Sequence, residues 1–191
     1  MKTVRELHEA KTEERRSRFL AYLTPYAHFE TLREELRSRH PKANHIAYAW
    51  RRFNEHGQCE EHSSDDGEPK GCAGMPILNA MRGAELVECA LLVVRYFGGI
   101  KLGTGGMARA YGAAANSVIR EATLHSWVKK EYFVFYSDYR AQRQIHYEFQ
   151  RLNIKNFRIH YEGGRIRWTL LSTCETIEEL NTRLGRVISL F

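Results

Sequence analysis

The stretch ALLVVRYFGGIKLGTGGMARAYGAAANSVIREA, residues Ala90–Ala122, decides the fold of this 191-residue chain. It opens with the apolar run 91–94, which contains two valines and predicts a buried strand. A nine-residue segment follows, 98–106, in which five residues are glycine. The remainder is rich in alanine and predicts a helix. We therefore expect a strand, a glycine-rich loop and a helix in succession.

A glycine-rich loop before a helix can bring backbone N–H groups onto an anion, because the helix dipole favours negative charge at that end. Arg95, Lys101 and Arg109 lie before, within and just after the loop. This pattern predicts a phosphate-contacting surface. The alternative is a tight turn in which glycine serves backbone conformation alone. The loop matches neither GxxxxGK[ST] nor GxGxxG, so we expect no cofactor there.

The composition bounds the class of protein. Lysine and arginine outnumber aspartate and glutamate by 29 to 23, a net charge of +6 that suits an anionic partner such as nucleic acid. No apolar run approaches the roughly 20 residues of a membrane span, and the charged first residues lack the apolar core of a signal peptide. We expect a cytoplasmic protein whose four widely spaced cysteines are free thiols, with neither a zinc site nor disulfides.

The first part of the chain shows several further elements. We expect strands at 18–24 and 43–53 and helices at 28–40 and 75–83, from the periodicity of their apolar residues. The polar segment 54–74 is expected to be one long loop. The polar passage 123–130 is expected to be a hinge, with one domain at 1–126 and a second at 127–191.

The second domain is expected to follow a βαββα order. Strands are predicted at 131–136, 156–161 and 165–172, and helices at 138–152 and 176–188. Asp138 is a candidate N-cap, and Gly163-Gly164 marks a hairpin turn. This order is most of a ferredoxin-like βαββαβ unit, and the three residues 189–191 are too few to decide whether a final strand forms.

The segment Ser64–Pro69, called here the acidic loop, contains the carboxylates Asp65, Asp66 and Glu68. Three carboxylates in four positions could hold Mg²⁺ through oxygen ligands. The alternative is a solvated turn, or carboxylates that pair with the cations of the glycine-rich segment. No local pattern predicts a catalytic residue.

Guanidinium groups also stand beside rings in this region. Arg95 precedes Tyr96, and Arg109 lies two residues before Tyr111. Arginine binds phosphate in bidentate fashion and rings stack on unpaired bases, which favours nucleic acid. The alternative is that the rings belong to the core.

Four motifs in this order resemble the signature of the IMPACT/YigZ family: SDDGEP at 64–69, AGMPIL at 73–78, VRYFGGIKLG at 94–103 and GGMARAYG at 105–112. The resemblance implies two α+β domains. The first would be a βαβ-type domain like domain IV of elongation factor G and a ribosomal small-subunit protein. The second would be ferredoxin-like, as in domain V of that factor. It also implies that part of an N-terminal strand is missing and that the chain ends early.

The resemblance adds a functional expectation, since both kinds of relative touch RNA or the ribosome. Eukaryotic members restrain a kinase pathway that shuts down translation, and the first fold also occurs in small-molecule kinases. We expect a non-enzymatic RNA- or ribosome-associated modulator of translation. An enzyme that binds a phosphorylated metabolite, with Mg²⁺ at the acidic loop, and a protein–protein regulator remain alternatives. The predicted phosphate- or nucleic-acid-binding residues are Lys70, Arg95, Tyr96, Gly98, Gly99, Lys101, Gly103, Gly105, Gly106, Arg109 and Tyr111.

Overall fold

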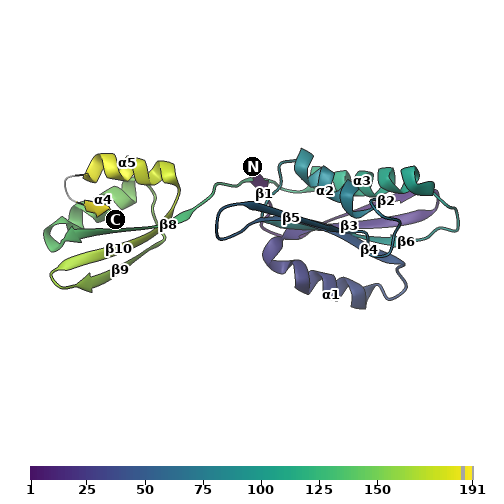
Figure 1. Cartoon of the computed structure of the whole chain (residues 1–191), viewed down its shortest axis with the longest axis horizontal. Helices are drawn as coiled ribbons and strands as arrows, with labels where there is room; N and C mark the ends of the chain where they lie inside the picture. Colours follow the sequence, from purple (N-terminus) through teal and green to yellow (C-terminus); the bar gives the residue numbers. More distant parts are fainter. Residues whose placement is uncertain (186–187, 191) are drawn as a thin grey trace. The chain divides into compact units, whose positions relative to one another are not determined.

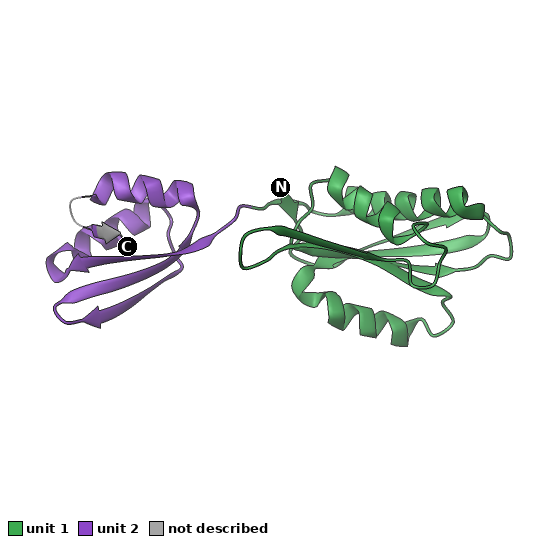
Figure 2. Ribbon diagram, in the orientation of Figure 1, with its two compact units in different colours: residues 1–127 green, residues 128–191 purple. Residues whose placement is uncertain are grey.

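The structure is a computed structural model that describes residues 1–185 and 188–190. The chain divides into two compact units, residues 1–127 and residues 128–191 (Figure 2). This division lies one residue from the boundary expected from the sequence. Each unit has its own hydrophobic core and is mixed α+β, as predicted, and the main sheet of each is antiparallel.

The first unit is built on a five-stranded sheet. Its strands in spatial order are β2 (His8–Glu14), β3 (Ser17–Pro25), β6 (Cys89–Tyr96), β4 (His45–Phe53) and β5 (Cys59–Ser64). All neighbouring strands are antiparallel. Because β3 and β4 both pair with β6, they run parallel to each other on its two sides.

Helices cover both faces of this sheet (Figure 1). The short 3-10 turn η1 (Tyr26–His28) leads into α1 (Phe29–Arg39) on one face, whereas α2 (Gly74–Gly83) and α3 (Gly103–Glu121) cover the other. The central strand β6 is therefore buried on both sides, and Cys89–Val94 are fully buried. A two-sided environment explains why this strand is a continuous apolar run rather than an alternating one.

The polar passage expected to be a hinge is partly ordered. The two-residue strands β1 (Lys2–Thr3) and β7 (His125–Ser126) pair, and Trp127 stacks on Phe53 with ring centroids 4.6 Å apart. These contacts hold residues 125–127 against the first unit.

The second unit has the βαββαβ order of a ferredoxin-like unit. Its elements are β8 (Glu131–Asp138), η2 (Tyr139–Ala141), α4 (Gln142–Arg151), β9 (Phe157–Glu162), β10 (Arg165–Ser172), α5 (Cys174–Leu184) and β11 (Ile188–Leu190). The strands lie in the order β11-β8-β10-β9. Both helices pack on one face, where Trp168 contacts Phe135 and Phe149.

Several boundaries differ from the sequence-based predictions. The segment expected to be one loop contains β5, a polar edge strand that lacks the apolar alternation used to find strands. The helix α3 already begins at Gly103, so the loop is shorter than predicted. A strand absent from the prediction, β2, pairs along its whole length with β3.

Two predictions in the second unit also need correction. Asp138 precedes the 3-10 turn η2 and not α4, and its side chain makes no capping hydrogen bond. The last helix ends at Leu184, and Ile188 begins β11, which pairs with β8. Residues 186–187 and 191 lie outside the described residues.

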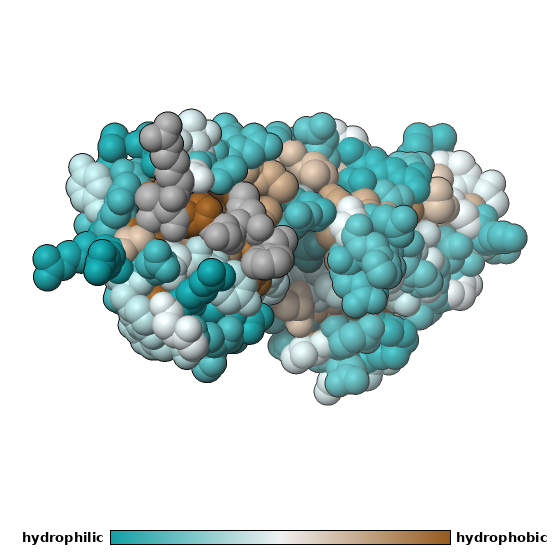
Figure 3. Space-filling model, turned by 60° about the vertical axis from the view of Figure 1, so that its left-hand side comes forward, coloured by the Kyte–Doolittle hydropathy of each residue, from teal (hydrophilic) through white to brown (hydrophobic). Residues whose placement is uncertain are grey.

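Hydrophilic residues cover most of the molecular face drawn in Figure 3, and hydrophobic ones emerge in smaller areas between them. Among the described helices, none is long and apolar enough to span a membrane.

Candidate functional site

The glycine-rich segment turns sharply between β6 and α3. Gly99 and Gly103 have φ angles of +84° and +70°, a region that favours glycine because it has no Cβ. Gly98 is needed for a different reason: a Cβ there would lie 2.1 Å from the backbone carbon of Arg16. Glycine at these positions therefore meets a requirement of backbone conformation or of close packing.

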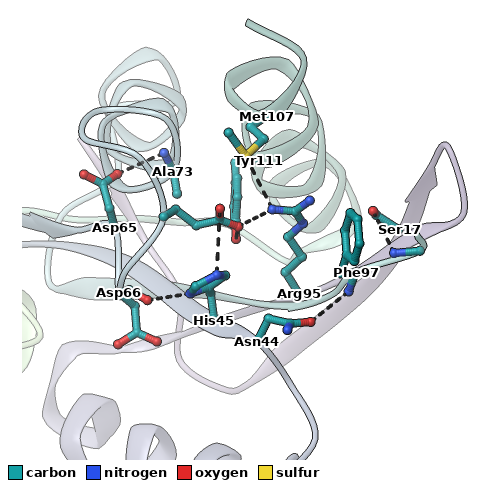
Figure 4. Close-up of polar contacts among 12 residues, drawn as sticks. Ser17, Asn44, His45, Asp65, Asp66, Ala73, Arg95, Phe97, Met107 and Tyr111 are labelled. Atoms are coloured by element: carbon teal, nitrogen blue, oxygen red, sulfur yellow. Dashed lines mark hydrogen bonds and ion pairs between the residues drawn. The ribbon is translucent and has the colours of Figure 1, made fainter. Parts of the chain in front are cut away.

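Two polar side chains hold this segment in place (Figure 4). Ser17 accepts a hydrogen bond from the backbone N–H of Gly98 at 3.2 Å, and Asn44 accepts one from Phe97 at 3.1 Å. Neither residue was predicted from the sequence as part of the site. They come from β3 and from the turn before β4, so only the sheet brings them to the segment.

Arg95 points toward Tyr111 of α3 (Figure 4). Both residues form a buried cluster with Glu68. Its Nη1 lies 2.5 Å from Glu68 Oε1, and the Tyr111 hydroxyl donates to the same oxygen at 2.8 Å. Burial raises the pKa of Tyr111, and the neighbouring Glu68 carboxylate raises it further, so this tyrosine remains a hydrogen-bond donor.

This cluster corrects part of the predicted phosphate surface. Arg95 is 6% exposed and Tyr111 is fully buried, so neither presents its polar group to a ligand at the surface. Tyr96 projects to the opposite face of the sheet, where its hydroxyl is hydrogen-bonded to His40 Nδ1 at 2.8 Å. Consecutive strand residues alternate faces, which separates Tyr96 from Arg95.

His45 joins the cluster from the neighbouring strand. It stands directly opposite Arg95 in the β4–β6 register. Its Nδ1 donates to the backbone carbonyl of Asp66 at 2.7 Å, and its Nε2 lies 3.9 Å from Glu68. The strand register is the signal that could have paired His45 with Arg95.

The remaining carboxylates of the acidic loop have separate structural partners. Asp65 accepts hydrogen bonds from the backbone N–H groups of Gly71, Ala73 and Gly74 at 2.8–3.0 Å. Burial alone would raise the pKa of Asp65, but these backbone donors outweigh it and the pKa is lowered. Asp66 accepts from the Ile46 backbone N–H at 2.7 Å.

The acidic loop therefore packs on the end of the strand and on the helix that flank the glycine-rich segment. Its three carboxylates bind different donors instead of converging. In the described part of the chain, no group of three or more His, Cys, Asp or Glu side chains could hold a metal ion. The four cysteines, all described, are free thiols, as the sequence predicted.

Of the four cations that the sequence predicted to bind phosphate, Lys70, Lys101 and Arg109 are exposed at the surface. Arg109 folds back over the first turn of α3, with Nη1 3.5 Å from the point where a Cβ on Gly105 would lie. A pocket of about 240 Å³ adjoins this turn, and its lining includes Gly106, Arg109 and Arg15. Arg15, in the β2–β3 turn, was missed because the sequence alone shows no link between this turn and α3.

Comparison with known proteins identifies the family. The model of the Impact N-terminal domain matches residues 15–119, more than half of the chain. The chain belongs to the IMPACT family. The resemblance seen in the sequence motifs is confirmed, and the matched range contains the glycine-rich segment, the acidic loop and the buried cluster.

Several relatives share this assignment. The IMPACT family member in the pol 5′ region of Thermus thermophilus is 46% identical over 123 residues, which cover 60% of this chain and 63% of the relative. YigZ of Escherichia coli, an IMPACT family member, is 40% identical over 114 residues, which cover 58% of this chain and 56% of YigZ. The matches thus span less than two thirds of the length of these relatives.

A solved structure has a similar fold over the whole chain. The crystal structure of a hypothetical protein covers 100% of this chain and 95% of its own, with a TM-score of 0.73 and 26% identity. Both units of this IMPACT family member therefore have counterparts in a solved fold.

Proposed function

We propose that this IMPACT family member is a non-enzymatic RNA- or ribosome-associated protein that modulates translation in the cytoplasm. One observation carries the proposal. The carboxylates of the acidic loop bind partners within the fold, while Lys70, Lys101 and Arg109 stay exposed and make no ion pair with any described residue. The surface around the glycine-rich segment is left with an excess of positive charge, which suits a polyanion.

The proposed site is narrower than the one expected from the sequence. It keeps Lys70, Lys101 and Arg109 with the backbone of the glycine-rich segment, and it omits Arg95, Tyr96 and Tyr111. Membership of the IMPACT family also supports the proposal, because the domains that this family resembles touch RNA or the ribosome. We also propose that the first unit is related to domain IV of elongation factor G and to a ribosomal small-subunit protein, and the second to domain V. The first unit contains two parallel strands, β3 and β4, which lie on either side of β6 and are joined by α1. This βαβ connection supports the relationship proposed for the first unit.

Ribosome co-sedimentation and RNA gel-shift assays with the full chain test the proposal. Binding should weaken steeply with salt, because phosphate contacts release counterions. The variant Arg109→Glu should weaken binding, since it reverses a charge at the first turn of α3. Arg120→Glu is the matched control, because Arg120 is exposed near the far end of the same helix.

Two results would contradict the proposal. Absence of salt-sensitive binding to ribosomes and to RNA would refute the association itself. Equal loss of binding in Arg109→Glu and Arg120→Glu would refute a site at the glycine-rich segment, because net charge alone would then explain the effect.

The pocket beside α3 is lined by Arg15 and Arg109 but also by Glu13 and Glu14, and it supports a second candidate, the binding of a phosphorylated metabolite by the two arginines. Its volume of about 240 Å³ is below the roughly 300–1,000 Å³ of most small-molecule sites, which makes this the weaker candidate. Thermal-shift measurements with nucleotides and sugar phosphates test it. A rise in melting temperature that Arg15→Ala abolishes would support it, and no shift with any of these compounds would refute it.

A further inference from the structure

The four-stranded sheet of the second unit has helices on one face only. Strand alternation places Phe135, Trp168 and Leu170 against α4 and α5. The opposite face, called here the open face, is formed by Tyr132, Val134 and Tyr136 of β8, by Arg165, Arg167, Thr169 and Leu171 of β10, and by Arg158, His160 and Glu162 of β9. No described element of this unit packs on it.

The open face combines an aromatic ring with an apolar floor. Tyr132 is 74% exposed and stands opposite Leu171 in the strand register. Val134 lies two residues further along the same face and is only half-buried. An exposed ring beside partly buried aliphatic side chains offers a flat surface for stacking.

Cations surround this floor. A shallow hollow of about 340 Å³ is lined by Tyr132, Thr169 and Leu171 together with Lys155 and Arg158. A second hollow, of about 450 Å³, is lined by Val134 and Tyr136 together with Arg165, Arg167 and the carboxylate of Glu162. Each hollow thus joins ring or aliphatic surface to two cations.

The charges on the open face are incompletely compensated. Glu162 lies 3.6 Å from Arg167 and 3.7 Å from His160, so this carboxylate is shared. Lys155, Arg158 and Arg165 form no ion pair with any residue that the structure describes. The sequence of this domain agrees with that imbalance, since residues 128–191 hold 11 basic and 7 acidic residues.

We propose that the open face binds single-stranded RNA, with Tyr132 stacking on a base and Arg158 and Arg165 contacting phosphates. Cations alone would suit any polyanion, but an exposed ring on an apolar floor adds a stacking surface that unpaired bases can use and stacked bases of a duplex cannot reach. An acidic protein segment would use the cations and gain little from the ring. This inference rests on the proposed association with RNA and assigns it a second surface, outside the glycine-rich segment.

Fluorescence anisotropy with a labelled single-stranded RNA of about 12 nucleotides tests the proposal on the full chain, within the usual range of site sizes. Tyr132→Ala should weaken binding about 5- to 150-fold, the range measured for loss of one stacked base. Tyr147→Ala is the matched control, because Tyr147 is a 57% exposed ring on α4, on the helix side of the same unit.

The cations are tested by salt dependence. Arg158→Ala and Arg165→Ala should each lower the slope of log affinity against log salt by about 0.7, the value for one phosphate contact to a single strand. Arg143→Ala is the control, since Arg143 is exposed on α4 and faces away from the open face. Circular dichroism and the unfolding midpoint of each variant check that the fold is intact.

The outcomes separate this inference from the proposed function. Loss of binding in Tyr132→Ala but not in Tyr147→Ala supports the open face. Full binding in Tyr132→Ala, Arg158→Ala and Arg165→Ala, with loss in Arg109→Glu, overturns it and leaves the first site standing. Displacement of the RNA by a polyglutamate chain at equal charge, with no effect of Tyr132→Ala, overturns it in favour of an acidic protein. Absence of RNA and ribosome binding in the unaltered protein overturns both proposals.

Discussion

Replacing Glu68 by glutamine tests whether the Glu68–Arg95 pair fastens the acidic loop to the sheet. Glutamine keeps the size of the side chain and can still accept a hydrogen bond from Tyr111, so the change removes mainly the negative charge. The side chains of Arg95 and Glu68 are 7% and 3% exposed, which leaves the Arg95 guanidinium buried without its counter-charge. Its Nε already has no hydrogen-bond partner among the described residues.

The expected magnitude follows from the burial of both groups. Removing one partner of a buried ion pair costs about 3–5 kcal/mol, because the remaining charge is uncompensated. Two unit charges about 4 Å apart attract by about 4 kcal/mol at an effective dielectric constant of 20, which agrees with that range. This loss is a large part of the roughly 5–15 kcal/mol that stabilises a typical domain.

Hydrogen exchange of the full chain measures the effect in each unit separately. Because β6 is the fully buried central strand, we expect its amides to exchange only when the first unit opens, so their protection should fall by roughly two to four orders of magnitude in Glu68→Gln. Amides of β10 in the second unit should not change. Glu60→Gln is the control, since Glu60 pairs with Arg52 at the surface, where ion pairs contribute little to stability.

The double variant Glu68→Gln/Arg95→Met keeps the test meaningful if the single variant unfolds. It removes both charges and should be more stable than Glu68→Gln, because no buried charge is left unpaired. A loss of protection in Glu68→Gln no larger than that in Glu60→Gln would refute the reasoning. So would a double variant that is less stable than Glu68→Gln.

Three further predictions concern the same unit. Asp65→Asn should destabilise the start of α2. Because the folded pKa of Asp65 lies below 3.8, the stabilisation by its carboxylate is complete above about pH 4 and is lost as the pH falls through the folded pKa. The urea midpoints of variant and parent should therefore converge in acid and stay apart at pH 7. Gly98→Ala should lower the free energy of unfolding by about 1–3 kcal/mol, because its Cβ would meet the backbone of the β2–β3 turn. Gly105→Ala should be neutral or stabilising by up to about 1 kcal/mol. Equal unfolding midpoints for these two variants would contradict the packing argument. In the folded protein, exposed Cys59 should react with a thiol reagent. Burial raises the pKa of Cys89 to about 12, so this thiol should stay unmodified until the protein unfolds. Mass spectrometry of the labelled peptides distinguishes the two cysteines.

Local sequence patterns were enough for most elements of the fold. The apolar run 91–94 is unbroken because β6 is buried on both faces, and such a run has few structural interpretations other than a buried strand. The helices that became α1 and α2 were found from apolar spacing and from proline at or near an end. The hairpin at Gly163-Gly164 was found because a two-residue turn with both residues at positive φ requires this chemistry. The motif order was enough for the family.

Partners that are distant in sequence decided the candidate site. Arg95 looks like a phosphate ligand when it is read beside the glycine-rich segment, yet Glu68, 27 residues earlier, neutralises it inside the fold. The strand β5 escaped detection because its residues are polar on both sides of the sheet edge, so it lacks apolar alternation.

The sequence by itself thus determined the two-domain α+β architecture, most of the helices and strands and the membership of the IMPACT family, because these depend on local periodicity and on ordered motifs. Only the tertiary structure decided which charges remain at the surface, since neutralisation depends on distance in space. In the folded protein the carboxylates of the acidic loop bind partners within the fold, and Arg95 and Tyr111 are buried. Lys70, Lys101 and Arg109 stay exposed. The tertiary structure also placed Tyr132 and the arginines of β9 and β10 together on the open face, because strand register sets which side chains share a face.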